Sequence, residues 1–114
     1  MENVNVDERY FDLGTILSVT SGYLFTDIGN IYDILSYITS THVNVYNMLY
    51  SLRVTEFCIL QRYPQLKGIG KDISVLNEND SVTFVNYQKT IFGESLALTP
   101  ISKERNNSLE CNGR

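Results

Sequence analysis

The chain lacks most of the residues from which catalytic and metal sites are built. Its 114 residues include one histidine, two cysteines, two prolines and no tryptophan. A catalytic triad or a histidine-based metal site would therefore have to be built on His42. The soft metal ligands, His42, Cys58 and Cys111, lie far apart without the spacing typical of zinc sites. We expect no metal, no cofactor and no enzymatic activity.

Basic residues and long apolar runs are also scarce. The formal net charge of −4 argues against binding to duplex nucleic acid, which requires bases to neutralise phosphates. No stretch approaches the roughly 20 apolar residues of a membrane span, and the acidic N-terminus lacks the pattern of a signal peptide. We therefore expect a cytoplasmic protein without membrane contact, in which Cys58 is a core thiol and Cys111 an exposed one.

The Gly68–Lys71 stretch has the glycines and lysine of a phosphate-binding loop but fails the full pattern. Gln65 stands where the first glycine is needed, and Asp72 where serine or threonine is needed. We interpret this segment as a turn.

Apolar periodicity predicts a small, mainly α domain of three or four helices with a short extended C-terminal segment. Residues 11–19 show a short helical pattern that Ser21-Gly22 ends, and residues 28–38 show one face of an amphipathic helix capped by Thr26 or Asp27. The globular domain should span residues 10–101, between a flexible acidic N-terminus (1–9) and a flexible polar tail (102–114).

The longest expected helix covers residues 43–62, with Thr41 as its N-cap and Pro64 as its stop. Its apolar stripe broadens near the C-terminal end, which suggests a central helix that is covered on more than one side. The predicted buried positions are Val45, Met48, Leu49, Leu52 and Ile59.

Residues 81–92 fit either a strand or a helix, and residues 96–101 look extended, which leaves an α+β fold with a C-terminal hairpin as the alternative.

Several short motifs resemble a family of short phage and prophage proteins of unknown function. The resemblance covers roughly residues 11–101, and rests on residues 13–22 (LGTILSVTSG), 32–35 (YDIL), 41–42 (TH), 61–66 (QRYPQL) and 92–96 (FGESL). It implies a phage-encoded accessory protein, gives no catalytic residues, and favours a helix for residues 81–92.

Candidate binding residues come from aromatic and charged positions. Tyr46, Tyr50 and Arg53 fall at i, i+4 and i+7, and could complete the core, form a protein-binding face or stack a nucleotide base. Thr41-His42 could line the same surface. Residues 1–50 hold six acids and one base, whereas residues 51–114 hold seven acids and eight bases. We expect the exposed acids Asp7, Glu8 and Asp12 to steer the chain towards a basic partner surface.

These observations favour binding over catalysis. The most specific hypothesis is an inhibitor of a bacterial host defence system, which acts in the host cytoplasm by binding a host protein. The alternatives are a sponge for a small cyclic nucleotide, with Tyr46 or Tyr50 beside Arg53, Arg62 or Lys71, and a virion or assembly accessory protein. A small core and exposed tyrosines are also compatible with a homodimer.

Overall fold

The computed structural model describes residues 8–69 and 78–101, which form a mainly helical domain with one small sheet. This confirms the predicted fold class. The tails at 1–7 and 102–114, and Gly70 and Lys71 of the predicted turn, lie outside the described residues. The elements, in chain order, are β1 (Arg9–Asp12), α1 (Leu13–Ser21), α2 (Ile28–Thr39), α3 (Met48–Arg62), the 3-10 turn η1 (Pro64–Leu66), α4 (Glu78–Phe92) and β2 (Ser95–Leu98).

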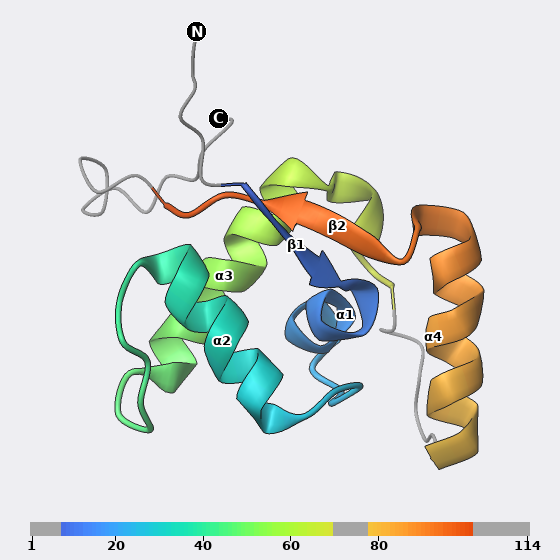
Figure 1. Cartoon of the computed structure of the whole chain (residues 1–114), viewed down its shortest axis with the longest axis horizontal. Helices are drawn as coiled ribbons and strands as arrows, with labels where there is room; N and C mark the ends of the chain where they lie inside the picture. The colour runs from blue at the N-terminus through green and yellow to red at the C-terminus, as the bar shows by residue number, and fades with distance from the viewer. Residues whose placement is uncertain (1–7, 70–77, 102–114) are drawn as a thin grey trace, which may run out of the picture.

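The sheet joins the two ends of the domain rather than forming the alternative C-terminal hairpin. Strands β1 and β2 pair antiparallel, with Arg9 opposite Leu98 and Asp12 opposite Ser95, and they lie across α1 (Figure 1). Phe11 was expected to belong to the first helix, but it lies in β1 with its side chain buried. The helix begins only at Leu13, because the Asp12 side chain accepts a hydrogen bond from the Gly14 N–H (2.8 Å) and caps it there.

Helix α1, not the expected longest helix, is the central one. Every residue from Leu13 to Thr20 is buried. The buried Ser18 side chain is satisfied locally, since its hydroxyl donates to the Gly14 carbonyl (2.8 Å) and accepts from the Phe25 N–H (2.7 Å). Small, satisfied polar residues let α2, α3, α4 and both strands pack closely against α1 at little desolvation cost.

Helix α2 begins at Ile28, as its periodicity predicts. Asp27 occupies the N-cap position but makes no side-chain capping bond. The buried face consists of Ile31, Ile34, Leu35 and Ile38. Ile28 was predicted to share this face, but its side chain is 51% exposed, because the first turn of α2 extends past the core.

Helix α3 begins at Met48, five residues later than predicted. The preceding residues form a loop, in which Val43 is buried and the Asn44 side chain accepts hydrogen bonds from the Tyr46 and Asn47 N–H groups (2.8 and 3.2 Å). The predicted cap at Thr41 is therefore wrong. These side-chain bonds give the backbone an alternative to helical pairing.

The buried face of α3 also differs from the predicted one. It consists of Ser51, Val54, Thr55, Cys58 and Ile59. Of the predicted positions only Ile59 is buried, whereas Val45 is 72% and Leu49 69% exposed. Cys58 is disulfide-bonded, so the prediction of a free thiol there is wrong. Cys111 lies outside the described residues.

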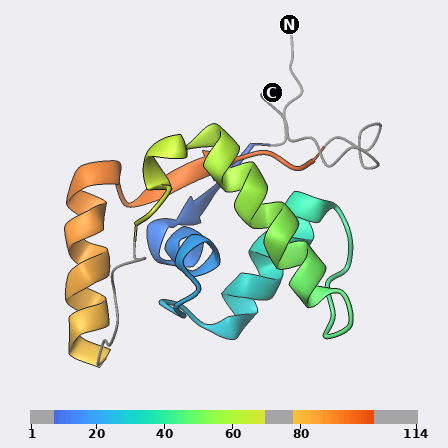
Figure 2. The ribbon, with the colours of Figure 1, turned by 180° about the vertical axis from the view of Figure 1, so that it is seen from behind.

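Helix α4 confirms the helical interpretation of residues 81–92 and excludes the strand. It lies at the outer side of the molecule in both Figure 1 and Figure 2. The Phe84 ring stacks on Phe25 with the ring centroids 5.5 Å apart. Gly93, with φ of 103°, then turns the chain into β2, which begins one residue before the predicted extended segment at 96–101 and ends within it.

Candidate functional site

A groove lined largely by apolar side chains opens where α1, α2 and α3 meet. Its volume is about 370 Å³. We call it the apolar groove. It is lined by Ser18, Val19, Gly22, Tyr23, Leu24, Ile28, Ile31, Met48, Leu49, Leu52, Arg53 and Glu56. Figure 2 shows the face on which α3 passes in front of α2, with α1 beside them.

Three of the apolar side chains at this groove are mainly exposed. Leu24 is 61%, Ile28 51% and Leu49 69% exposed. Leu24 lies on the turn after α1, Ile28 at the start of α2 and Leu49 in the first turn of α3. The apolar residues at positions 48–52, which the sequence pattern places in the core, therefore line an open groove. Clustered exposed apolar side chains of this kind mark interaction surfaces.

Charge at the apolar groove is nearly balanced. Arg53 and Glu56 line it, and Asp27 precedes Ile28 in the chain. None of these three side chains forms an ion pair within the described ranges. Two acids and one base leave a small negative excess beside the groove.

The three residues of the predicted aromatic stripe do not line one surface. Tyr46 lies in the turn before α3 and is 93% exposed. Tyr50 and Arg53 are neighbours on α3, but Arg53 lines the apolar groove whereas Tyr50 lines a second cavity. His42 is an exposed residue of the loop before α3, and its carbonyl accepts a hydrogen bond from the Asn47 side chain (3.2 Å).

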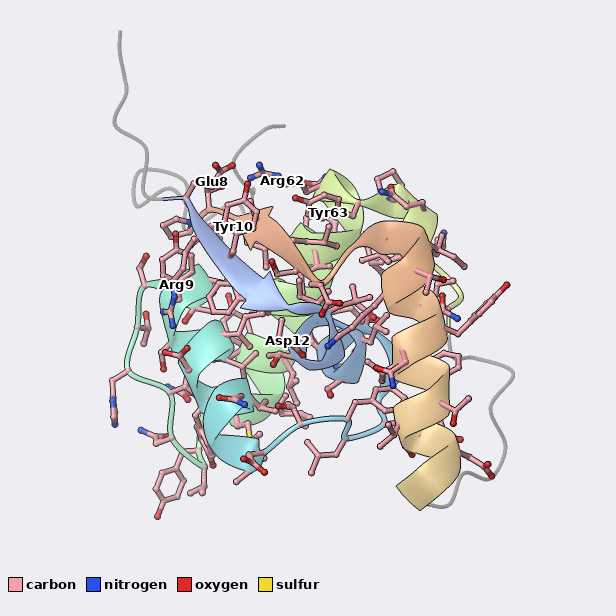
Figure 3. All side chains as sticks on the ribbon, turned by 45° about the vertical axis from the view of Figure 1, so that its right-hand side comes forward. Glu8, Arg9, Tyr10, Asp12, Arg62 and Tyr63 are labelled. Atoms are coloured by element: carbon pink, nitrogen blue, oxygen red, sulfur yellow. The ribbon has the colours of Figure 1, made fainter. Side chains whose placement is uncertain are left out.

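The predicted acidic residues that the structure describes are paired with bases. Glu8 binds Arg62 with an oxygen–nitrogen distance of 2.7 Å, and the two side chains lie together in Figure 3. Asp12 binds Lys89 at 3.2 Å. Asp7, the third member, lies outside the described residues. Because both carboxylates are paired, Glu8 and Asp12 do not form a free acidic patch.

These pairs tie β1 to three helices. Glu8 reaches α3, Asp12 reaches α4, and Arg9 binds Asp33 of α2 at 2.6 Å while its guanidinium carbon lies 4.7 Å from the centre of the Phe11 ring. Exposed pairs of this kind each contribute about 0.2–1 kcal/mol. A hydrogen bond to Asp12, with Glu94 also nearby, raises the pKa of Lys89. The acids near the N-terminus thus stabilise the position of β1.

The residues proposed for a nucleotide sponge do not line one cavity. Tyr50 lines a different cavity from its helix neighbour Arg53, and Arg62 is paired with Glu8. Lys71 lies outside the described residues. Within the described part of the chain, no group of three His, Cys, Asp or Glu side chains is positioned to hold a metal ion.

The sequence pattern does not indicate that Leu24 and Ile28 line the apolar groove. Leu24 follows the end of a helix and Ile28 fits the buried stripe of the next one, so nothing in their local pattern indicates exposure.

No helix of the described ranges is long and apolar enough to cross a membrane. No protein-family model, no curated protein and no solved structure matches the chain.

Proposed function

We propose that this chain is a non-enzymatic binding protein that holds an apolar segment of another protein in the apolar groove. One observation carries this proposal: Leu24, Ile28 and Leu49 are more than half exposed around a single groove. Burial of apolar area contributes about 25 cal/mol per Å², so these side chains are a source of binding energy that the fold itself leaves unused.

The partner best suited to this surface has an apolar segment flanked by basic residues. The groove supplies the apolar contact, while Glu56 and the nearby Asp27 outnumber Arg53. This local excess replaces the broader acidic face that we inferred from the N-terminal half, because Glu8 and Asp12 are already paired. Charge at the rim of an interface mainly affects the rate of association.

The specific form of the proposal is a phage-encoded inhibitor of a bacterial host defence system. It rests on the resemblance of residues 11–101 to phage and prophage proteins, together with the groove. Action inside the host follows from the resemblance alone. The prediction of reduced cysteines no longer supports it, because Cys58 is disulfide-bonded and such bonds are rare in the cytosol.

The test compares two substitutions of exposed apolar residues. Leu49→Lys places a charge at the groove, whereas Val82→Lys changes a residue that is 59% exposed on α4, a helix that contributes no residue to the lining of the groove. Wild-type chain is used to capture partners from a bacterial lysate, and the affinity of each purified partner is then measured for all three chains. We expect Leu49→Lys to weaken binding by at least about tenfold, as at an interface hot spot, and Val82→Lys to leave it unchanged.

The function in the host is tested by plating phage on bacteria that carry a defence system and express each chain. Wild type and Val82→Lys should restore plaque formation, and Leu49→Lys should not. Equal binding by Leu49→Lys and wild type would contradict the groove as the docking surface. Restoration of plaques by Leu49→Lys would contradict its role in inhibition.

A further inference from the structure

A second cavity lies on the opposite face of α3 from the apolar groove, and four of the seven residues that line it carry a hydroxyl group. Its volume is about 310 Å³, at the small end of the roughly 300–1,000 Å³ of ligand sites. We call it the hydroxyl cavity. It is lined by Thr39, Thr41, Asn47, Tyr50, Ser51, Val54 and Ile101. None of these side chains carries a charge.

Ser51 supplies an unused polar group in this cavity. Its side chain is only 3% exposed, and its hydroxyl has no hydrogen-bond partner among the described residues. One helical turn further along α3, the Thr55 hydroxyl is fully buried and has no hydrogen-bond partner within the described ranges. Buried polar groups are nearly always hydrogen-bonded, to protein or to ordered water. The Ser51 hydroxyl lines the cavity, so a molecule that occupies the cavity can supply its hydrogen bond.

The two threonines complement Ser51 as acceptors. The Thr39 hydroxyl donates its proton to the Leu35 carbonyl (2.8 Å), and the Thr41 hydroxyl donates to the Thr39 carbonyl (3.1 Å). Both oxygens keep lone pairs for an incoming N–H or O–H group. The Asn47 side chain is already bound to the loop, by its oxygen to Asn44 and by its nitrogen to His42.

Apolar surface in the cavity restricts the shape of the ligand. Val54 and Ile101 are buried, and the ring of Tyr50 stands beside them among the lining residues. A flat heterocycle can place its faces on these groups and its polar edge on the hydroxyls. A sugar would instead leave some of its hydroxyls against Val54 and Ile101, at the cost of unpaired polar groups.

We propose that the hydroxyl cavity binds an uncharged nucleobase or nucleoside. The ligand edge would present a carbonyl to the Ser51 hydroxyl and an N–H to a threonine oxygen. Because the lining residues provide no cation, a phosphorylated nucleotide should not bind more tightly than the nucleoside. This site is independent of the protein-binding function and uses a different face of α3.

The proposal is tested on the full chain with uridine, whose ring has an N–H flanked by carbonyls. Binding is followed by amide chemical shifts in NMR spectra. We expect saturable shifts at residues of the cavity, weaker binding of 3-methyluridine, and no gain in affinity for uridine monophosphate. Ser51→Ala should weaken uridine binding by roughly three- to tenfold, the effect of one lost hydrogen bond. Thr83→Ala, at an exposed position of α4, is the matched control and should bind as wild type does.

A second variant protects the test against misfolding. Tyr50→Ala removes the lining ring at a position that is 58% exposed, so it should keep the spectrum of the folded chain and weaken uridine binding. The absence of saturable shifts up to about 10 mM uridine would overturn the proposal. So would unchanged affinity in a folded Ser51→Ala chain, tighter binding of uridine monophosphate than of uridine, or saturation by glucose in place of uridine.

Discussion

Asp12 offers the clearest test of whether the acids near the N-terminus stabilise the fold or contact a partner. Its carboxylate accepts the Gly14 N–H at 2.8 Å and pairs with Lys89 at 3.2 Å. Loss of an N-cap side chain costs about 1 kcal/mol, within a range of about 0.5–2. The ion pair contributes only a few tenths of a kcal/mol, because the Asp12 side chain is 55% exposed.

The Asp12→Ala variant should therefore unfold about 1–2 kcal/mol more easily than wild type, which corresponds to a loss of about 5–8 °C in Tm. Asp12→Asn keeps an oxygen that can accept the Gly14 N–H and removes only the charge. We expect it to lose less than about 0.5 kcal/mol. Urea unfolding followed by circular dichroism measures both variants, and an unchanged m-value confirms that the same transition is compared.

Two results would refute this reasoning about Asp12. If the alanine and asparagine variants are equally destabilised, the cap is not the main contribution of the side chain. If Asp12→Asn is as stable as wild type but associates more slowly with a purified partner at low salt, the carboxylate acts in steering. Lys89→Met, alone and combined with Asp12→Ala, isolates the ion pair in a double-mutant cycle.

Three further predictions concern single interactions. Tyr63→Phe removes the hydroxyl that donates to the Ala97 carbonyl at 2.6 Å, and should lower the free energy of unfolding by about 0.5–1.5 kcal/mol in urea titrations; unchanged stability would show that this bond does not help to hold β2. Ser18→Ala leaves the Phe25 N–H without its acceptor at 2.7 Å, and should cost about 1–3 kcal/mol in thermal unfolding; a neutral effect would contradict the role of Ser18 in fixing the turn after α1. The pKa of Lys89 is raised above its ordinary 10.5, so its contribution is fully present below that pH and is lost as the pH rises through the folded-state value. Wild type should lose more stability than Lys89→Met across this alkaline range, and parallel pH profiles would refute the shift.

Sequence periodicity predicted most helices because each buries a face whose residues recur locally. The pattern from Ile31 to Ile38 is sufficient to place α2, and Gly22 and Gly93 mark the ends of α1 and α4. Periodicity failed at the start of α3. There, the Asn44 side chain binds backbone N–H groups that a helix would otherwise use, and the apolar residues that follow belong to a groove.

The candidate site was predictable only in part. Tyr50 and Arg53 were predicted to belong to one binding stripe, but they line two different cavities, and this depends on where the other elements pack against α3. Ser51 carries no functional signal in sequence, because a serine within a helix is unremarkable until its burial and missing partner are known. Glu8 and Asp12 were read as free acids because their basic partners are distant in the chain.

The sequence by itself determined a small helical domain with few means for catalysis, since apolar periodicity and residue inventory are local or additive properties. Only the tertiary structure decided that the N-terminal segment is a strand, since its partner β2 lies more than 80 residues away. It also decided which acids are paired, that α1 rather than α3 is central, and which apolar residues remain exposed. These properties depend on contacts between distant segments, and such contacts are fixed by the packing of the whole chain.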